Sequence, residues 1–328
     1  QDVIAVDILD RLIEGDEHMA HMLNLSPQMI VLTNIEEDHL DFYRDLQHIE
    51  DTFQEYIEIL PEDGKLIVNA DDRTSFFGLR PKTPFVTYAL AAAADYGAKK
   101  IDVADGAQTF EIVRREKRKR TSLGRFTLRI PGAFNVANAL AAATAAFELG
   151  ISPDVVRASL SEFHGIWRRF ERVGERPMDP QSGSGQSAVI ISDYGHHPTA
   201  VRATVEGAKE FFPDRRIVLA FQPHHHNRTK KLFNEFVASF DGVDLLVLSE
   251  IYTVPGREGQ EGYHGVSSLD LVKAVQERDG ERGNPREVIY AASVAETKAL
   301  LEKKILPGDV VLIMGAGDIY TIAAKLVR

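Results

Sequence analysis

Two polar stretches carry most of the residue types that could do chemistry. Residues 192–199 read Ser-Asp-Tyr-Gly-His-His-Pro-Thr, residues 222–229 read Gln-Pro-His-His-His-Asn-Arg-Thr, and together they hold five of the eleven histidines. Each stretch follows a short apolar run typical of a buried strand and precedes a helix pattern. Open α/β folds bind ligands at the carboxyl ends of parallel strands. We therefore expect the two stretches to share one site.

The residue types leave more than one chemistry open. Three neutral imidazoles beside a carboxylate would hold Zn²⁺, as in a metal-dependent hydrolase. Alternatively, a small carboxylate would bind between His197 at a helix N-terminus and the fork-shaped guanidinium of Arg228. A third interpretation is that the loops are solvated and their histidines incidental.

A second pair of candidate residues lies near the start of the chain. Glu14 belongs to an acidic cluster at a predicted strand end, and His39 follows a predicted strand at 29–32. Oxygen and imidazole ligands at strand ends suit Mg²⁺ that bridges phosphates. The same two residues would also fit a loop and a helix cap that bind no metal.

The elements that must position these residues differ between the two halves of the chain. From residue 188 onward, β and α patterns alternate, which predicts a parallel sheet with helices on both faces. Alternating apolar residues between 83 and 131 predict antiparallel strands instead. We therefore predict an α/β protein with two domains, residues 1–170 and 171–328. The strands expected in the second domain are 188–192, 216–221, 244–250, 286–291 and 309–314, and the helices lie near 198–212, 229–240, 267–277, 293–304 and 319–327.

Composition narrows the classes of function. The chain has 328 residues, 44% of them apolar, and a formal net charge of −11. That charge disfavours a general nucleic-acid or anionic-membrane surface, and the one dense basic run, at 114–120, is expected to form an exposed hairpin. The absence of cysteine excludes disulfides and thiolate metal sites. No apolar run approaches the ~20 residues of a membrane span, so we expect a cytoplasmic protein.

Eight motifs in order resemble the Mur ligase family, and they extend over essentially the whole chain. The last three most resemble the branch of the family that joins L-alanine to UDP-N-acetylmuramate. In this sequence the motifs are Glu14-Gly-Asp-Glu, Thr33-Asn-Ile-Glu-Glu-Asp-His39, Asn69-Ala-Asp-Asp, Gly132-Ala-Phe-Asn135-Val-Ala-Asn138, Arg168-Arg-Phe-Glu, Asp193-Tyr-Gly-His-His-Pro, Phe221-Gln-Pro-His and Met314-Gly-Ala-Gly.

The resemblance implies an ATP- and Mg²⁺-dependent ligase of peptidoglycan synthesis, which activates a carboxylate as an acyl phosphate before an amine attacks. It implies a truncated P-loop-type ATP-binding central domain and a Rossmann-like C-terminal domain. UDP-N-acetylmuramate and L-alanine would be the substrates, with no nucleic-acid or membrane partner. The implied roles are Mg²⁺ binding by Glu14 and His39, adenine contacts by Asn135 and Asn138, phosphate contacts by Arg169, a ribose contact by Asp193, and an amino-acid pocket of Tyr194, His196 and Arg228.

The sequence also departs from the family pattern. The phosphate-binding motif Gly-x-x-x-x-Gly-Lys-Ser/Thr does not occur in the chain, and the domain that holds the UDP-sugar is not present. We therefore expect that the chain cannot complete the reaction alone. Phe134 stands where the family usually has His, and His225 where the alanine-adding branch usually has Arg. A murein-tripeptide recycling ligase and a non-catalytic binding protein remain alternatives.

Overall fold

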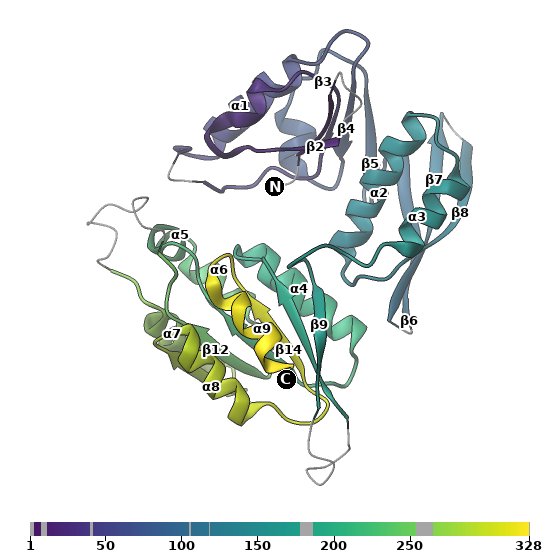
Figure 1. The fold of residues 1–328 in the computed structure, drawn as a ribbon. Helices are drawn as coiled ribbons and strands as arrows, with labels where there is room; N and C mark the ends of the chain where they lie inside the picture. The colour runs from purple at the N-terminus through teal and green to yellow at the C-terminus, as the bar shows by residue number, and fades with distance from the viewer. Residues whose placement is uncertain are drawn as a thin grey trace. The chain divides into compact units, whose positions relative to one another are not determined.

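The structure, a computed structural model, describes residues 3–7, 12–39, 42–104, 106–117, 119–177, 186–253 and 265–327, without the side chains of 3–7 and 12–14. The chain forms two compact units (Figure 1). The first unit comprises residues 1–103, 107–129 and 134–163, and the second comprises 104–106, 130–133 and 164–328. Residues 164–170, which the sequence analysis assigned to the first domain, make their contacts within the second unit.

The first unit is built on an eight-stranded sheet in the order β2-β1-β3-β4-β5-β6-β7-β8. Strands β3 to β6 are parallel to one another, whereas β1 is antiparallel to both β2 and β3. The expected antiparallel arrangement after residue 83 is therefore wrong for β5 and β6, because the chain crosses over after β4 and extends the parallel sheet. The strands are β1 Val3–Asp7, β2 Leu12–Gly15, β3 Pro27–Leu32, β4 Lys65–Asn69, β5 Phe85–Ala89, β6 Tyr96–Ala104, β7 Ala107–Glu116 and β8 Lys119–Leu128.

The antiparallel prediction is correct for β7 and β8. Phe110 pairs with Phe126 across this hairpin, and both rings are fully buried. The described residues of the basic run lie at the exposed end of the hairpin, where Glu116 pairs with Lys119. The alternation of apolar and polar residues thus buries one face of the hairpin and leaves its charged tip in solvent.

The helices of the first unit follow local sequence signals. The side chain of Asp45 accepts a hydrogen bond from the N–H of His48 and caps α1, whose apolar face includes Phe53 and Ile57. No helix in the described part of the chain is long and apolar enough to cross a membrane. The helical segments of this unit are η1 His18–Asn24, α1 Leu46–Glu58, η2 Thr74–Gly78, α2 Ala133–Glu148 and α3 Pro153–Glu162.

The second unit contains the predicted parallel sheet. Its order is β13-β12-β11-β14-β10-β9, and only β9, next to β10, is antiparallel to its neighbour. Each predicted strand agrees with an observed strand to within two residues at either end. The strands are β9 Glu171–Arg176, β10 Ala188–Asp193, β11 Ile217–Phe221, β12 Leu245–Ser249, β13 Glu287–Ala291 and β14 Val310–Met314.

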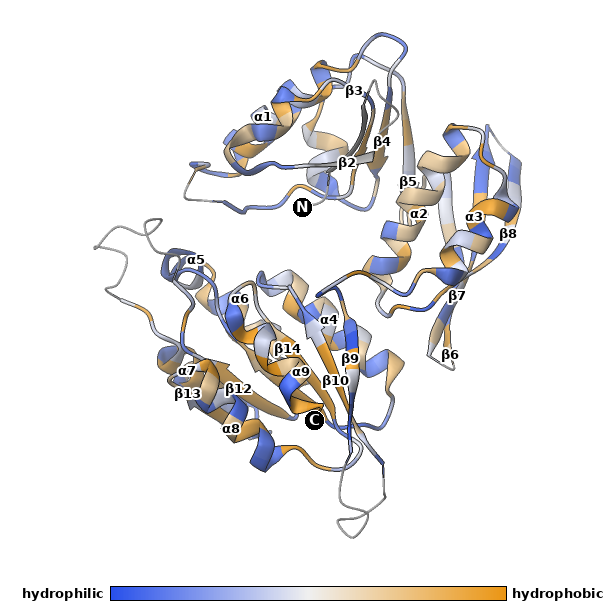
Figure 2. Cartoon of the chain, viewed as in Figure 1, coloured by the Kyte–Doolittle hydropathy of each residue, from blue (hydrophilic) through white to orange (hydrophobic). Residues whose placement is uncertain are grey.

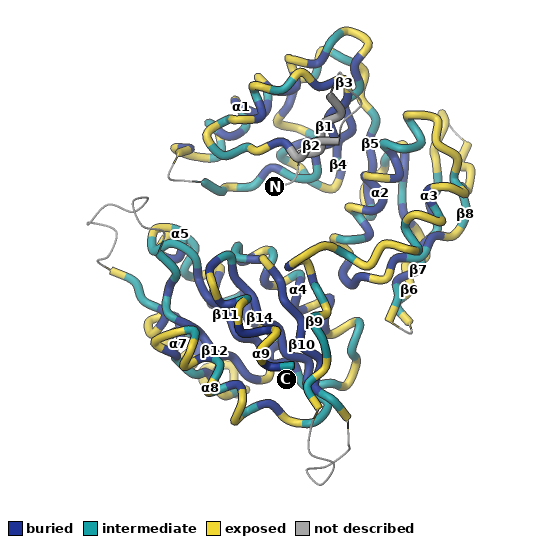
Figure 3. Tube along the Cα trace, viewed as in Figure 1, coloured by how far each residue is buried: buried dark blue, intermediate teal, exposed yellow. Residues whose placement is uncertain are grey.

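Helices cover both faces of this sheet, which is why its central strands read as continuous apolar runs (Figures 2 and 3). One face packs against α4 Pro198–Phe211, α6 Phe233–Ser239 and α7 Ser268–Glu281. The other face packs against α8 Val294–Lys304, the 3₁₀ segment η5 Asp318–Ile322 and α9 Ala323–Leu326.

Two predicted helices differ in detail from the structure. The helix expected at 229–240 is divided into α5 His226–Lys231 and α6, with the break at Leu232. The helix expected at 319–327 is mostly the tighter turn η5, and only four residues form α9. In both places, apolar periodicity continues through a change of backbone direction that the pattern does not reveal.

A buried ion pair braces the second unit at the amino end of its sheet. The Arg216 guanidinium donates two hydrogen bonds, of 2.9 and 2.8 Å, to the Asp309 carboxylate, which is 2% exposed. The carboxylate also accepts the N–H of Leu306. This hydrogen bonding to Asp309 raises the pKa of Arg216.

Replacement of Arg216 by Met should therefore lower the free energy of unfolding of the second unit by about 3 kcal/mol, because it leaves a buried carboxylate without its cation. Urea unfolding followed by circular dichroism would measure the loss. The matched control is Arg282→Met, since the exposed Asp241 partner of Arg282 keeps its bonds to Arg278. The control should lose less than about 1 kcal/mol, and equal losses in the two variants would contradict the account.

Candidate functional site

Three loops of the second unit begin at the same level of the sheet. Asp193 at the end of β10 pairs with Met314 at the end of β14, and Met314 pairs on its other side with Phe221 at the end of β11. The two predicted polar stretches and the glycine-containing turn after β14 therefore leave one edge side by side. This is the carboxyl edge, where parallel α/β sheets bind ligands.

Asp193 is the most constrained group at this edge. Its carboxylate accepts the N–H of Gly195 at 2.7 Å and the N–H of Phe170 at 2.8 Å, and the residue is only 7% exposed. Burial raises the pKa of Asp193, while the two N–H groups and the charges of Arg169 and Arg168 act in the opposite direction. The carboxylate thus joins the linker before β9, residues 167–170, to the loop after β10.

The turn after β14 packs directly on Gln222. A Cβ on Gly315, whose φ is 143°, would lie 2.6 Å from the carbonyl oxygen of Gln222, so this contact requires glycine. The Gln222 amide donates to the Asp318 carboxylate at 3.0 Å and accepts the N–H of Ile319 at 3.2 Å. Gln222 is 4% exposed, so this network fixes the position of two loops relative to each other.

One histidine from each loop lies near the other, His196 of the first and His224 of the second. The His196 ring lies 5.2 Å from the Tyr194 ring and 5.9 Å from the His224 ring, and its Nδ1 is 3.1 Å from the carbonyl oxygen of Tyr194. His224 also stacks on Tyr252 at 5.5 Å. Within the described residues, no group of three or more His, Asp or Glu side chains is arranged to hold a metal ion.

The two arginines assigned to this site lie on different elements. Arg169 is exposed in the linker before β9, with its guanidinium carbon 5.6 Å from the centre of the Tyr194 ring. Arg228 lies in α5, directly after the second loop. The structure therefore groups Arg169 with Asp193 and Tyr194, and places Arg228 on the helix that follows His225.

In the first unit, the imidazole of His39 lies against the carboxylate of Glu17. Its Nε2 lies 3.0 Å from a carboxylate oxygen of Glu17, which is itself largely buried. The Tyr43 hydroxyl donates to the carbonyl oxygen of Glu17. Burial, aided by the charge of Glu17, raises the pKa of Tyr43 to about 12, which keeps this hydroxyl protonated. Glu14 lies in β2, and its side chain is outside the described residues.

The donors around His39 fit Mg²⁺ better than Zn²⁺. His39 together with the predicted Glu14 would supply one imidazole and one carboxylate, and Mg²⁺ bound to phosphates typically takes only one or two protein ligands. A structural or catalytic zinc ion needs three or four. Glu17 belongs to the acidic motif that was recognised in the sequence, but strand alternation does not tell which of its carboxylates faces His39.

The loop that carries His39 is fixed by the Asn69-Ala-Asp-Asp motif. The Asn69 amide donates to the carbonyl oxygen of Thr33 at 2.9 Å, and the Asp72 carboxylate accepts the N–H of Ile35 at 3.1 Å. Asp71 points elsewhere, and its carboxylate accepts N–H groups of residues 90–92. The two adjacent carboxylates therefore organise two different loops.

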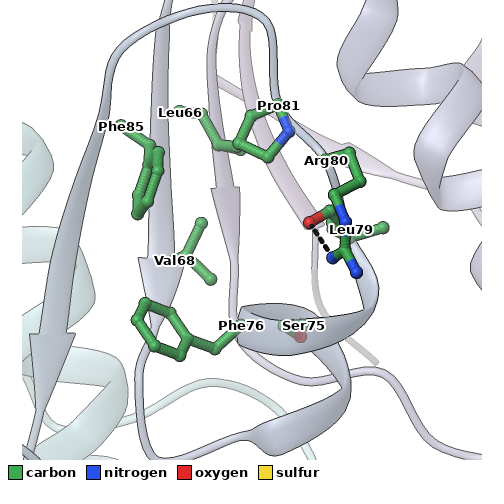
Figure 4. A pocket seen from close by; sticks show the side chains of 8 residues that line it. All are labelled: Leu66, Val68, Ser75, Phe76, Leu79, Arg80, Pro81 and Phe85. Atoms are coloured by element: carbon green, nitrogen blue, oxygen red, sulfur yellow. Dashed lines mark hydrogen bonds between the residues drawn. The ribbon is translucent and has the colours of Figure 1, made fainter.

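Asn135 and Asn138 lie one turn apart near the start of α2, so they share one face of the helix. Asn135 is half-buried and Asn138 is exposed. A cavity of about 230 Å³ lies elsewhere in the first unit, between β4, β5 and η2 (Figure 4). Its walls are mainly apolar and contain none of the predicted site residues. They are Leu66, Val68, Ser75, Phe76, Leu79, Arg80, Pro81 and Phe85.

Comparison with known proteins bears on both units. The family model of the Mur ligase middle domain matches residues 13–146, and the model described as the Mur ligase, glutamate ligase domain matches residues 168–317. The UDP-N-acetylmuramate–L-alanine ligase of Desulfitobacterium hafniense is 37% identical over 318 residues, which cover 96% of this chain and 65% of that protein. The enzyme of the same name from Burkholderia vietnamiensis is 38% identical over 321 residues, which cover 96% of this chain and 64% of that protein.

Among solved structures, the UDP-N-acetylmuramate–alanine ligase of Thermotoga maritima superposes with a TM-score of 0.68 at 25% identity, over 94% of this chain and 60% of that one. The chain thus spans about 65% of the length of the curated relatives it matches. The two domain matches follow each other in the order that the sequence motifs predicted. The chain therefore belongs to the Mur ligase family and carries its middle and C-terminal domains.

Proposed function

We propose that this chain is part of an ATP-dependent ligase that joins L-alanine to UDP-N-acetylmuramate in peptidoglycan synthesis, a reaction of the cytoplasm. The observation that carries the proposal is the match, at 37–38% identity along 96% of the chain, to ligases of that name. The convergence of the Asp193 and His224 loops at one sheet edge supports it, since this edge is suited to bind substrates.

Nucleotide contacts are assigned to Asn135 and Asn138 in the first unit and to Arg169 and Asp193 in the second. Asn135 and Asn138 would face the adenine, and the exposed Arg169 would contact the phosphates. Asp193 would accept ribose hydroxyls. Its hydrogen bonds from Phe170 and Gly195 leave acceptor positions for them, because an ionised carboxylate has about four. The same carboxylate then both binds the nucleotide and holds the linker that carries Arg169.

The amino acid would lie against Tyr194 and His196, with its carboxylate paired to Arg228. A guanidinium matches a carboxylate in two parallel hydrogen bonds, which fixes orientation as well as position. The reaction needs the amine of this substrate close to the activated acyl carbon. The amine must also be neutral when it attacks.

Glu14 and His39 would hold Mg²⁺, which, when bound, neutralises charge on the transferred phosphoryl group. The chain's own contribution is to position these ligands. Glu17 orients the His39 ring, and Asp72 fixes the loop on which His39 stands. A ligand whose second nitrogen is bonded to a carboxylate is held in one tautomer and one direction.

The principal test uses the intact protein that contains this chain. With ATP and Mg²⁺ present, ADP release should require both UDP-N-acetylmuramate and L-alanine, and omission of either substrate should abolish it. Release that needs a murein tripeptide in place of L-alanine would instead identify a recycling ligase. If neither amine substrate supports release while ATP still binds, the proposed reaction is wrong.

The positioning role of Asp72 gives a second test. Asp72→Ala should weaken Mn²⁺ binding, used in place of Mg²⁺ in the presence of ATP, by about tenfold, because the loop that carries His39 loses its anchor at Ile35. Electron paramagnetic resonance of free and bound Mn²⁺ measures this directly. Asp71→Ala is the matched control, because Asp71 anchors residues 90–92 instead. If Mn²⁺ binding weakens equally in both variants, the positioning role assigned to Asp72 is wrong.

A further inference from the structure

The linker segment Trp167–Phe170 is bound tightly to the sheet edge of the second unit. The N–H of Tyr194 donates to the carbonyl oxygen of Arg168 at 2.6 Å, and the N–H of Phe170 donates to the Asp193 carboxylate at 2.8 Å. The N–H of Arg168 donates to the Glu171 carboxylate at 3.0 Å. The segment is therefore part of the ligand-binding edge rather than a loose connection.

The side chain of Arg168 adds a second attachment to another loop. Its Nη2 donates to the carbonyl oxygens of Gly315 and, at 3.3 Å, of Gly317. The guanidinium carbon lies 4.3 Å from the centre of the Tyr320 ring and 4.8 Å from that of the Tyr194 ring. Arg168 thus joins the linker to the turn after β14 and to the loop after β10 at once.

This arrangement is costly for stability. Arg168 is only 5% exposed, and its partners are carbonyls and ring faces rather than a carboxylate in direct contact. Its Nε–H is buried and finds no acceptor in the described part of the chain, which is unfavourable for a buried donor. Arg168 and Phe170 also have φ values of 57° and 51°, in the left-handed region that strains residues other than glycine. Costs of this kind concentrate at functional sites, where the surrounding structure enforces them.

The two strained residues have a clear geometric effect. Arg168 and Phe170 are both buried in the second unit, while Arg169 between them is exposed. The linker is thus held on each side of Arg169, by Gly315 and Gly317 through Arg168 and by Asp193 through Phe170. Attachment at two points fixes the direction of the residue between them.

We propose that Arg168 is a positioning residue of the nucleotide site, which clasps the linker to the Gly315–Gly317 turn and so holds Arg169 and Asp193 in the geometry that ATP requires. The inference rests on the proposed function for the identity of the nucleotide. Arg168 itself need not touch ATP. Lysine cannot replace it, because an ammonium group has no planar face to stack on the Tyr194 and Tyr320 rings while its nitrogen bonds the two carbonyls.

The test has a readout that is independent of catalysis. Trp167 is the only tryptophan of the chain, and its ring lies 5.5 Å from both the Arg168 guanidinium carbon and the centre of the Tyr320 ring. In the 328-residue chain, Arg168→Met and Arg168→Lys should lower the fluorescence anisotropy of Trp167 and raise its quenching by acrylamide. Arg172→Met, at an exposed arginine that pairs with the exposed Glu175, is the control and should change neither quantity.

The second readout is the affinity of the intact protein for ATP with Mg²⁺, measured by calorimetry. Both Arg168 variants should bind ATP about tenfold more weakly, and Arg172→Met should bind it normally. Should Arg168→Met fail to fold, Arg168→Lys retains the charge and tests the geometry. A folded variant with unchanged Trp167 fluorescence, or with changed fluorescence and unchanged ATP affinity, overturns the inference. A wild-type protein that binds ATP but does not use L-alanine would defeat the proposed reaction and leave this inference standing.

Discussion

The hydrogen bonds from Phe170 and Gly195 to the Asp193 carboxylate are the interaction on which the candidate site depends. A carboxylate that is 7% exposed is costly to bury, and here two backbone N–H groups and the nearby arginine charges offset part of the cost. Without it, the linker before β9 would be joined to the loop after β10 only through Arg168, whose carbonyl oxygen accepts the N–H of Tyr194 and whose guanidinium lies over the Tyr194 ring. One side chain therefore organises the backbone around it before it meets any ligand.

Because the sheet of the second unit is mostly parallel, few polar residues are needed to form its ligand-binding edge. Strands β10, β14 and β11 end in register, so their loops start side by side, and the close contact of Gly315 with Gln222 locks two of these loops together. The apolar runs behind them form cores on both faces of the sheet and supply most of the stability. The ligand-binding edge can then accommodate strained residues such as Arg168 and Phe170.

Much of this architecture was predictable because apolar runs and polar strand ends are local signals. The strands of the second unit, the grouping of Asp193 with Tyr194 and His196, and the β7–β8 hairpin follow from them. The partner of His39 was not predictable, since one acidic motif offers several carboxylates and only the fold selects Glu17. The left-handed backbone of Arg168 and Phe170 likewise has no signature in residue type. The break of the helix at Leu232 and the parallel direction of β5 and β6 depend on tertiary packing, which overrides a continuous apolar pattern.

Amide hydrogen exchange of the 328-residue chain tests the central claim most directly, because it reports on the two N–H groups that Asp193 binds. The amides of Phe170 and Gly195 should exchange as slowly as those of the buried strand β10, and in Asp193→Ala they should exchange at least about 100-fold faster while β10 stays protected. If these two amides exchange in the wild-type chain as fast as an open loop, or if their protection survives in Asp193→Ala, then Asp193 does not hold the linker to the site.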